Sequence, residues 1–198
     1  MHSRPHPSFA RRGFRRLALA LLLLGAPLTA ADYRLEEHTI RWTGSMPAKT
    51  HTGLLTPQSF AASIADDGTI ESLEVVLDMK SIDVTDLEGK QRDKLARHLR
   101  SEDFFHVEEY PTASFSLRRH ADGHLEGSIT IRGVTQPIEI PVSVTPNGET
   151  GWTLAGAFSF DRQEFNVNHQ NGGFFSAAKD KIIRDLVDLE IELVVAAS

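Results

Sequence analysis

The sequence predicts an all-β protein of about eight antiparallel strands, closed as a barrel or stacked as a sandwich. Three observations predict this class: apolar and polar residues alternate along most of the chain, tight-turn dipeptides separate the alternating stretches, and one charged stretch lacks the alternation. A two-residue period turns one face of a strand toward a core and the other toward solvent. Many short strands joined by local turns are typical of antiparallel barrels and sandwiches.

Eight stretches show the alternation. In one of them Trp152, Leu154, Gly156, Phe158 and Phe160 share a face, and the residues between them are small or polar. In chain order, the predicted strands centre on residues 40–42, 60–64, 73–79, 113–117, 127–131, 138–144, 152–160 and 187–193. Three dipeptides whose residues tolerate positive φ predict tight hairpins between strands. They are Asp67-Gly68, Asp122-Gly123 and Asn147-Gly148.

One stretch breaks the alternation and predicts a short helical insertion around residues 89–105. Residues 89–99 are rich in charge and lack β-branched side chains, and Leu95 and Leu99 fall on one helix face. Ser101 is expected to cap a short turn that follows the helix. A second connection without a strand pattern covers residues 166–181.

The first 31 residues have the pattern of a cleaved secretory signal peptide. Five arginines and no acidic residue precede the apolar run Leu17–Leu24, which is too short to span a bilayer. Small residues at positions 29–31 predict the cleavage point, so residues 32–198 form the expected mature domain. Because Arg11-Arg12 also resembles a twin-arginine signal, the export route, general secretory or twin-arginine, stays open.

Charge and cysteine content exclude several classes of function. Without residues 1–31 the chain keeps 16 basic and 27 acidic residues, a net charge of −11, which disfavours binding to nucleic acid. No second apolar segment is long enough to cross a membrane as a helix. The absence of cysteine excludes a disulfide, a thiol nucleophile, a cysteine zinc site and a c-type haem attachment motif.

An outer-membrane barrel is the alternative architecture, since it also alternates but turns its apolar residues toward lipid. The acidic face of the last predicted strand, Asp188, Glu190 and Glu192, would crowd a narrow lumen with like charges. In addition, the charged helical stretch interrupts the strand order, and the chain ends without an aromatic belt residue. These features favour an arrangement with the apolar faces inside.

The sequence contains few patterns of catalysis or metal binding. No histidine pair has the spacing of a helical zinc site, and neither a Gly-x-Ser-x-Gly turn nor a phosphate-binding glycine loop is present. We therefore expect no catalytic residue, no metal and no cofactor. A solvated acidic loop explains His98, Asp103 and His106, for which the alternative is an acid–base or metal site.

Several segments, in order along the chain, together resemble the YceI-like family of lipocalin-like, polyisoprenoid-binding proteins. Residues 98–115, HLRSEDFFHVEEYPTASF, are similar to its most characteristic segment, and residues 127–142 carry a similar Gly-Val-Thr-x-Pro turn between two strands. Residues 161–185 and the upstream Trp42-Thr43-Gly44 add to the resemblance, which covers essentially the whole mature chain. The run Asn166–His169 departs from the glycine- or tyrosine-rich run of related sequences.

The resemblance implies an eight-stranded antiparallel lipocalin-like barrel that is exported to the periplasm, is often paired as a homodimer and has no catalytic residue. It also implies a polyisoprenoid, an isoprenoid quinone or another long-chain lipid inside the barrel. Arg162, at the end of an apolar strand, either meets a polar head group or pairs with a nearby carboxylate. The side chains expected to line the cavity are Trp42, Phe104, Phe105, Phe115, Ile129, Ile131, Leu154, Phe158, Phe160 and Phe174.

Two other functions remain open at this point. The first is a periplasmic lipid-modifying enzyme with His98, Asp103 and His106 as acid–base groups. The second is a barrel filled by its own side chains that acts as a protein-interaction module, because composition alone does not separate a packed barrel from a hollow one.

Overall fold

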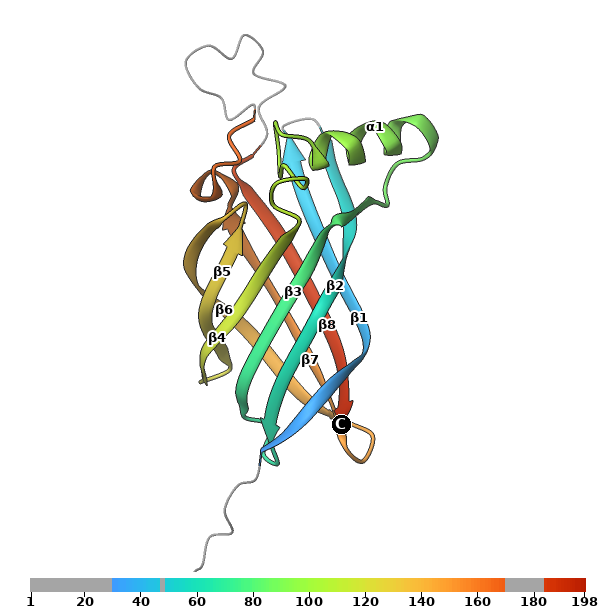
Figure 1. The fold of residues 1–198 in the computed structure, drawn as a ribbon. Helices are drawn as coiled ribbons and strands as arrows, with labels where there is room; N and C mark the ends of the chain where they lie inside the picture. Colours follow the sequence, from blue (N-terminus) through green and yellow to red (C-terminus); the bar gives the residue numbers. More distant parts are fainter. Residues whose placement is uncertain (1–29, 47–48, 170–183) are drawn as a thin grey trace, which may run out of the picture.

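Eight strands close into one barrel in the computed structural model, which describes residues 30–46, 49–169 and 184–198 (Figure 1). Each strand pairs antiparallel with the next along the chain, and the first pairs with the last. The strands are β1 Ala30–Met46, β2 Lys49–Ala65, β3 Ile70–Val84, β4 Thr112–Ala121, β5 His124–Ile131, β6 Val134–Asn147, β7 Gly151–Asp161 and β8 Leu186–Ala197. The prediction of an eight-stranded antiparallel barrel is confirmed, and the sandwich is excluded.

The strands are longer than the alternating stretches that predict them. β1 and β2 each have 17 residues, although only 40–42 and 60–64 show the apolar period. The polar half of β1 is held by the main-chain ladder with β8, where His38 stands opposite Leu193. A ladder of main-chain hydrogen bonds needs backbone groups and no particular side chain. A polar strand segment therefore shows no apolar–polar alternation from which it could be predicted.

The three predicted hairpin turns are present, and each uses its glycine at positive φ. The φ angles are 84° at Gly68, 73° at Gly123 and 67° at Gly148. These turns lie at or toward the end of the barrel that also holds the C-terminus (Figure 1). Toward that end Ile64, Ile70 and Val195 are buried, each at most 2% exposed.

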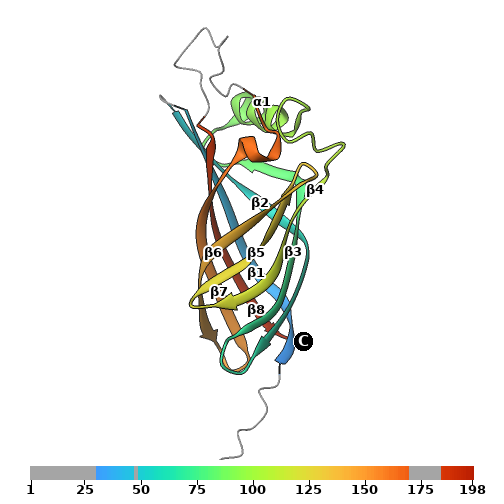
Figure 2. The same cartoon turned by 90° about the vertical axis from the view of Figure 1, so that its left-hand side faces the viewer.

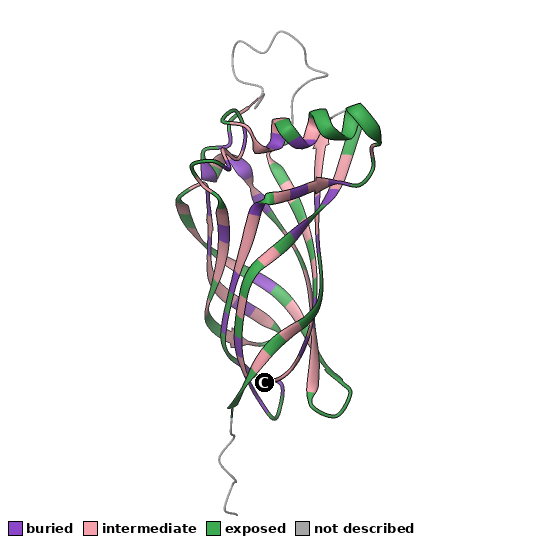
Figure 3. Ribbon diagram, turned by 45° about the vertical axis from the view of Figure 1, so that its right-hand side comes forward, coloured by how far each residue is buried: buried purple, intermediate pink, exposed green. Residues whose placement is uncertain are grey.

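The apolar face of each strand points into the barrel and the charged face points outward. Figure 3 shows this as bands of buried and exposed residues that alternate along the strands. On β8, Asp188, Glu190 and Glu192 are exposed, whereas Leu193 and Val195 are buried. This polarity is the reverse of an outer-membrane barrel, which turns apolar residues toward lipid.

The helices of the described residues can be compared with the requirements for crossing a membrane. None of them has the length and apolar character that a membrane crossing requires.

The ladder between β1 and β2 parts in the middle of the strands. Tyr33 pairs with Ala62 and Arg41 pairs with Leu54, but no pairs join the residues between these points. Pro57 of β2 lies in the parted stretch and pairs on its other side with Leu77 of β3. Since proline has no amide hydrogen to donate to a ladder, a stretch without a partner strand tolerates it.

The predicted helical insertion is confirmed as α1, Gly89–Arg100, which lies across the other end of the barrel (Figures 1 and 2). Leu99 is buried and Leu95 packs against the core, as the helical period predicts. Ser101 does not cap the next turn with its side chain. Its hydroxyl donates back to His98, while its carbonyl oxygen accepts from Phe104 and His106, because a hydroxyl at a helix C-terminus finds unsatisfied carbonyl groups.

Candidate functional site

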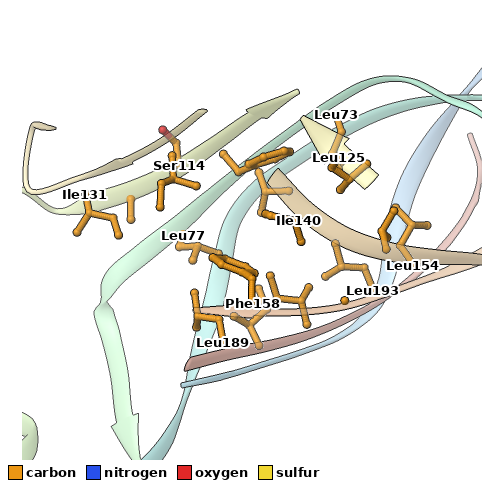
Figure 4. Close-up of a pocket in the computed structure, with 18 residues that line it drawn as sticks. Leu73, Leu77, Ser114, Leu125, Ile131, Ile140, Leu154, Phe158, Leu189 and Leu193 are labelled. Carbon is orange, nitrogen blue, oxygen red and sulfur yellow. The ribbon is translucent and has the colours of Figure 1, made fainter. Parts of the chain in front are cut away.

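The barrel interior contains a cavity in its central part, here named the lower cavity, which encloses about 100 Å³. Leu77, Ile140, Phe158 and Leu193 converge on it from β3, β6, β7 and β8 (Figure 4). Ser114 is the polar side chain among those that line it, and its hydroxyl oxygen points away from the other labelled side chains (Figure 4). The remaining lining is Ile40, Leu73, Val75, Ala113, Phe115, Leu125, Ile129, Ile131, Val142, Leu154, Gly156, Leu189 and Ile191.

A second cavity of about 100 Å³, here named the upper cavity, lies toward α1. Strand residues such as Trp42 and Phe160 line it together with Leu99 of α1 and Phe104 and Phe105 of the following connection. Arg162 is the charged residue in its lining. The other lining residues are Gly44, Leu55, Leu77, Met79, Ile82, Ala113, Ile131, Val187 and Leu189.

The two cavities are separated by four side chains that line both of them. We name these the constriction: Leu77, Ala113, Ile131 and Leu189. Beyond the upper cavity, a third pocket of about 250 Å³, the mouth groove, is lined by His51, Leu95 and His98. It shares Trp42, Gly44, Leu99 and Phe104 with the upper cavity. Pockets thus follow one another from the barrel centre to the α1 end.

The structure places the side chains that the sequence nominated around these two cavities. Phe115, Ile129, Leu154 and Phe158 line the lower cavity, Trp42, Phe104, Phe105 and Phe160 line the upper cavity, and Ile131 lines both. Phe174 lies outside the described residues. That these residues contact a ligand remains a prediction.

Sequence reasoning missed many lining residues, among them Leu73, Leu125 and Ile140. Their inward orientation was readable from the alternation of their strands. They were passed over because the selection favoured aromatic side chains, whereas the lining of the lower cavity is mostly aliphatic.

Small inward residues do not all leave space. A Cβ added to Gly127 would lie 2.8 Å from the Phe115 ring, so that ring already fills the volume beside Gly127. Gly156 and Ala113, in contrast, line the cavities directly. The interior space therefore depends on how each neighbouring side chain is oriented.

Arg162 begins the 3-10 helix η1, Arg162–Phe165, and is fully buried. Its guanidinium donates to the carbonyl oxygens of Val167 and Arg184, and it pairs with Asp185 at 3.4 Å. Burial lowers the pKa of Arg162 and the charges of Asp185 and Asp161 raise it, while an arginine stays protonated in proteins. The carboxylate pairing considered from the sequence is present, and Arg162 also lines the upper cavity.

The alternative that groups His98, Asp103 and His106 as an acid–base set is only partly matched by the geometry. His98 and Asp103 do lie together, but the third member of their group is His169, with ligand atoms of all three residues within 4.8 Å of one another. His106 has a positive φ of 49° and its Nδ1 lies 3.2 Å from Glu109. The turn therefore directs His106 to a different carboxylate.

Burial and neighbouring charges favour the neutral form of the His169 imidazole. The pKa of His169 is lowered by burial first and then by the charge of His98; the charge of Asp103 raises it, and that of Arg162 lowers it further. A neutral imidazole carries a free nitrogen lone pair, which is the form that accepts a proton or binds a metal.

Fold and interior together define the class of this protein: a lipocalin-like barrel that encloses apolar cavities. The chain belongs to the YceI-like family, because the model of the YceI-like domain matches residues 33–195. The match covers β2 to β7 in full, β1 from Tyr33 and β8 up to Val195.

Solved structures share this fold at low sequence identity. BcnA of Burkholderia cenocepacia aligns with a TM-score of 0.65 and 21% identity, over 81% of this chain and 99% of that one. A polyisoprenoid binding domain from Saccharophagus degradans aligns with a TM-score of 0.63 and 14% identity, over 86% of this chain and 100% of that one.

Curated relatives match over shorter stretches. A UPF0312 protein of Yersinia enterocolitica is 33% identical over 86 residues, which are 41% of this chain and 42% of the relative. A UPF0312 protein of Shewanella denitrificans is 30% identical over 124 residues, which are 58% of this chain and 60% of the relative. The chain thus spans about two fifths to three fifths of the length of these relatives.

Proposed function

We propose that the protein binds a long apolar ligand, a polyisoprenoid, an isoprenoid quinone or a related lipid, inside its barrel, and carries it through the periplasm after export. The observation that carries the proposal is the succession of the lower and upper cavities, whose lining is apolar except for Ser114 and Arg162. The proposal includes no catalytic step and no cofactor.

The energetics of such a site favour long chains over short ones. Burying one CH₂ group is worth about 0.8 kcal/mol, so a chain of many such groups needs few polar contacts to bind. A lipid that crosses an aqueous compartment must also be enclosed, and the barrel of eight strands, closed except where β1 and β2 part, provides the wall.

Ligand binding requires the interior to repack. Each cavity encloses about 100 Å³, whereas small-molecule sites usually enclose about 300–1,000 Å³. Leu77 and Leu189 of the constriction, together with Phe115 and Phe158, are only partly buried. Rotation of these side chains would join the two cavities into one channel.

The ligand enters with a defined direction in this proposal. Toward the end of the barrel that holds the C-terminus Ile64, Ile70 and Val195 are buried, and the pocket of about 620 Å³ where β1 and β2 part shares no lining residue with the two cavities. The mouth groove at the α1 end does share residues with the upper cavity. The apolar tail therefore points toward the lower cavity. A polar head group stays near Arg162 and the mouth groove, where a charged residue lines the wall.

Other properties of the protein belong to the same proposal. A structure of this fold is described as a polyisoprenoid binding domain, which supports the ligand class. Export rests on the signal-peptide pattern of residues 1–31, all but the last two of which lie outside the described residues. The homodimer stays a prediction.

The first experiment identifies the bound molecule. The protein is purified from its own compartment without detergent, extracted with organic solvent and examined by mass spectrometry. We expect a stoichiometric isoprenoid, quinone or acyl compound. A clean extract, together with unchanged Trp42 and Trp152 fluorescence when such lipids are added, contradicts the proposal and favours a barrel filled by its own side chains.

Substitution inside the lower cavity tests where the lipid binds. Phe158→Arg places a charge in the lining and should abolish capture, whereas Ala157→Arg changes the next residue, which is exposed on the outer face of β7. Both variants are checked by circular dichroism. Equal lipid content in the two folded variants would contradict a site inside the barrel.

A further inference from the structure

Three side chains with metal-binding atoms converge at the α1 end of the barrel from distant parts of the chain. His98 lies in the last turn of α1, Asp103 in the turn that follows it, and His169 after η1. A ring nitrogen of each histidine and a carboxylate oxygen of Asp103 all lie within 4.8 Å of one another.

The two imidazole rings are held face to edge by packing. Their centres are 4.6 Å apart with an angle of 82° between the planes. Both rings contact Phe104, which is buried, with ring centres 5.8 Å from His98 and 6.2 Å from His169. Among the residues that the structure describes, no hydrogen bond occupies a ring nitrogen of either histidine, so both remain available to a ligand.

We propose that His98, Asp103 and His169 bind one divalent transition-metal ion, of which zinc is the representative. Two imidazole nitrogens and one carboxylate oxygen are a common ligand set for such ions, with bonds of about 2.0–2.2 Å. Tetrahedral binding at those lengths needs donor atoms about 3.4 Å apart. The observed spread, up to 4.8 Å, closes by small rotations of three side chains that are half-buried or exposed.

The alternative to a metal site is that these three polar side chains are simply solvated at the rim of the barrel. Two observations argue against it: both histidines are half-buried rather than exposed, and their rings pack against the same buried phenylalanine. Among the described residues neither imidazole has a hydrogen-bond partner, and an ion between them would bind a nitrogen of each ring.

A metal ion here would join two segments at the rim of the barrel. It would tie the residues after η1 to the end of α1, beside the mouth groove that His98 and Phe104 line. Three protein ligands leave a coordination position for water or for an oxygen of a bound molecule. The site does not depend on lipid binding, so each proposal can fail while the other stands.

The test measures metal per chain on the purified protein without a polyhistidine tag. After equilibrium dialysis against Zn²⁺ we expect about one ion per chain by elemental analysis, and with Co²⁺ a visible absorption band of a protein-bound ion. His98→Ala, His169→Ala and Asp103→Asn should each weaken binding at least about tenfold, since even outer-shell partners of a metal are worth 10–100-fold.

The matched control is His106→Ala, which removes a histidine from the same connection but outside the cluster. It should bind zinc as the unsubstituted protein does. A melting temperature that rises with Zn²⁺ in the unsubstituted protein and in the control, but not in the three variants, supports the site independently. Absence of zinc binding, or binding that survives in the three folded variants, overturns the proposal.

Discussion

Trp42 shows how single residues shape the upper cavity. Its indole Nε1 donates to the carbonyl oxygen of Asp83 at 3.1 Å. Its ring occupies the space beside Gly53, which stands opposite Trp42 in the β1–β2 register. Only glycine fits at this point, since a Cβ on Gly53 would lie 1.8 Å from the carbonyl oxygen of Asp83 and 2.5 Å from the ring. The position of one cavity wall therefore depends on the absence of a side chain.

Gly53→Ala should destabilise the protein and displace Trp42. Crowding of this kind typically costs about 1–3 kcal/mol, or roughly 2–10 °C in melting temperature for a domain of this size. Thermal unfolding measures the loss, and a shift in tryptophan emission reports the displaced ring. Gly44→Ala is the control, because its Cβ would meet the same ring at an ordinary 3.9 Å. Equal stability of both variants would refute this account.

At the scale of elements, a side chain extends the contact between β3 and β4. The ladder joins only Glu74–Asp78 of β3 to Thr112–Ser116 of β4. Nearer the β2–β3 turn, the amide of Ile70 donates to Nδ1 of His120 at 3.0 Å. Burial lowers the pKa of His120, against a raising effect of Asp67. A protonated imidazole has no acceptor nitrogen, so this contact requires the neutral ring.

This contact predicts a pH dependence of stability. The folded pKa of His120 lies below the unfolded value, so the unfolded chain binds the proton more readily. The stabilising contribution of the neutral His120 ring is therefore complete above about pH 6.5 and is lost as the pH falls below it. His120→Asn keeps an acceptor but does not titrate, so its melting temperature should fall less between pH 7.5 and pH 5, by roughly 1–2 °C.

The control for this prediction is His38→Asn, which replaces an exposed histidine on β1. Both variants are unfolded by heat across the same pH series. The slope of melting temperature against pH is compared between them, and the difference between the two slopes reports the effect of His120 alone. A slope for His120→Asn that matches the unsubstituted protein would show that the Ile70 contact does not titrate.

At the scale of the whole molecule, a series of pockets leads from the barrel centre to the α1 end, whereas Ile64, Ile70 and Val195 are buried toward the opposite end. The constriction of Leu77, Ala113, Ile131 and Leu189 divides that series. Ala113 is the smallest of the four, so its methyl group leaves the space through which a chain would pass. The length of ligand that the barrel holds should therefore depend on this position.

Ala113→Phe should close the passage and shorten the ligand that binds. Prenyl alcohols of increasing chain length, followed by tryptophan fluorescence, should bind unchanged up to the length that fits the upper cavity. Longer chains should lose at least about tenfold in affinity, since burial of two CH₂ groups is worth about that much. Ser116→Phe, at an exposed position of the same strand, is the control. An equal loss of affinity for prenyl alcohols of every chain length would contradict a channel through the constriction.

Much of the fold was predictable because it depends on local patterns. The alternation in residues 152–160 and 187–193 predicted β7 and β8, and the dipeptides predicted the hairpins. The polar half of β1 was not predictable, since main-chain pairing with β8 holds it. For the site, the apolar period nominated inward side chains such as Phe158, but it did not reveal which inward residues border empty space.

By itself, the sequence determined the strands, the turns, the helix and the division of each strand into an apolar and a polar face, because these follow from neighbours a few positions apart. Only the tertiary structure decided that His169 meets His98 while His106 turns away, and that Arg162 is buried against Asp185. It also decided that Phe115 fills the space beside Gly127. These contacts depend on barrel closure and strand register, which join residues that no local pattern links.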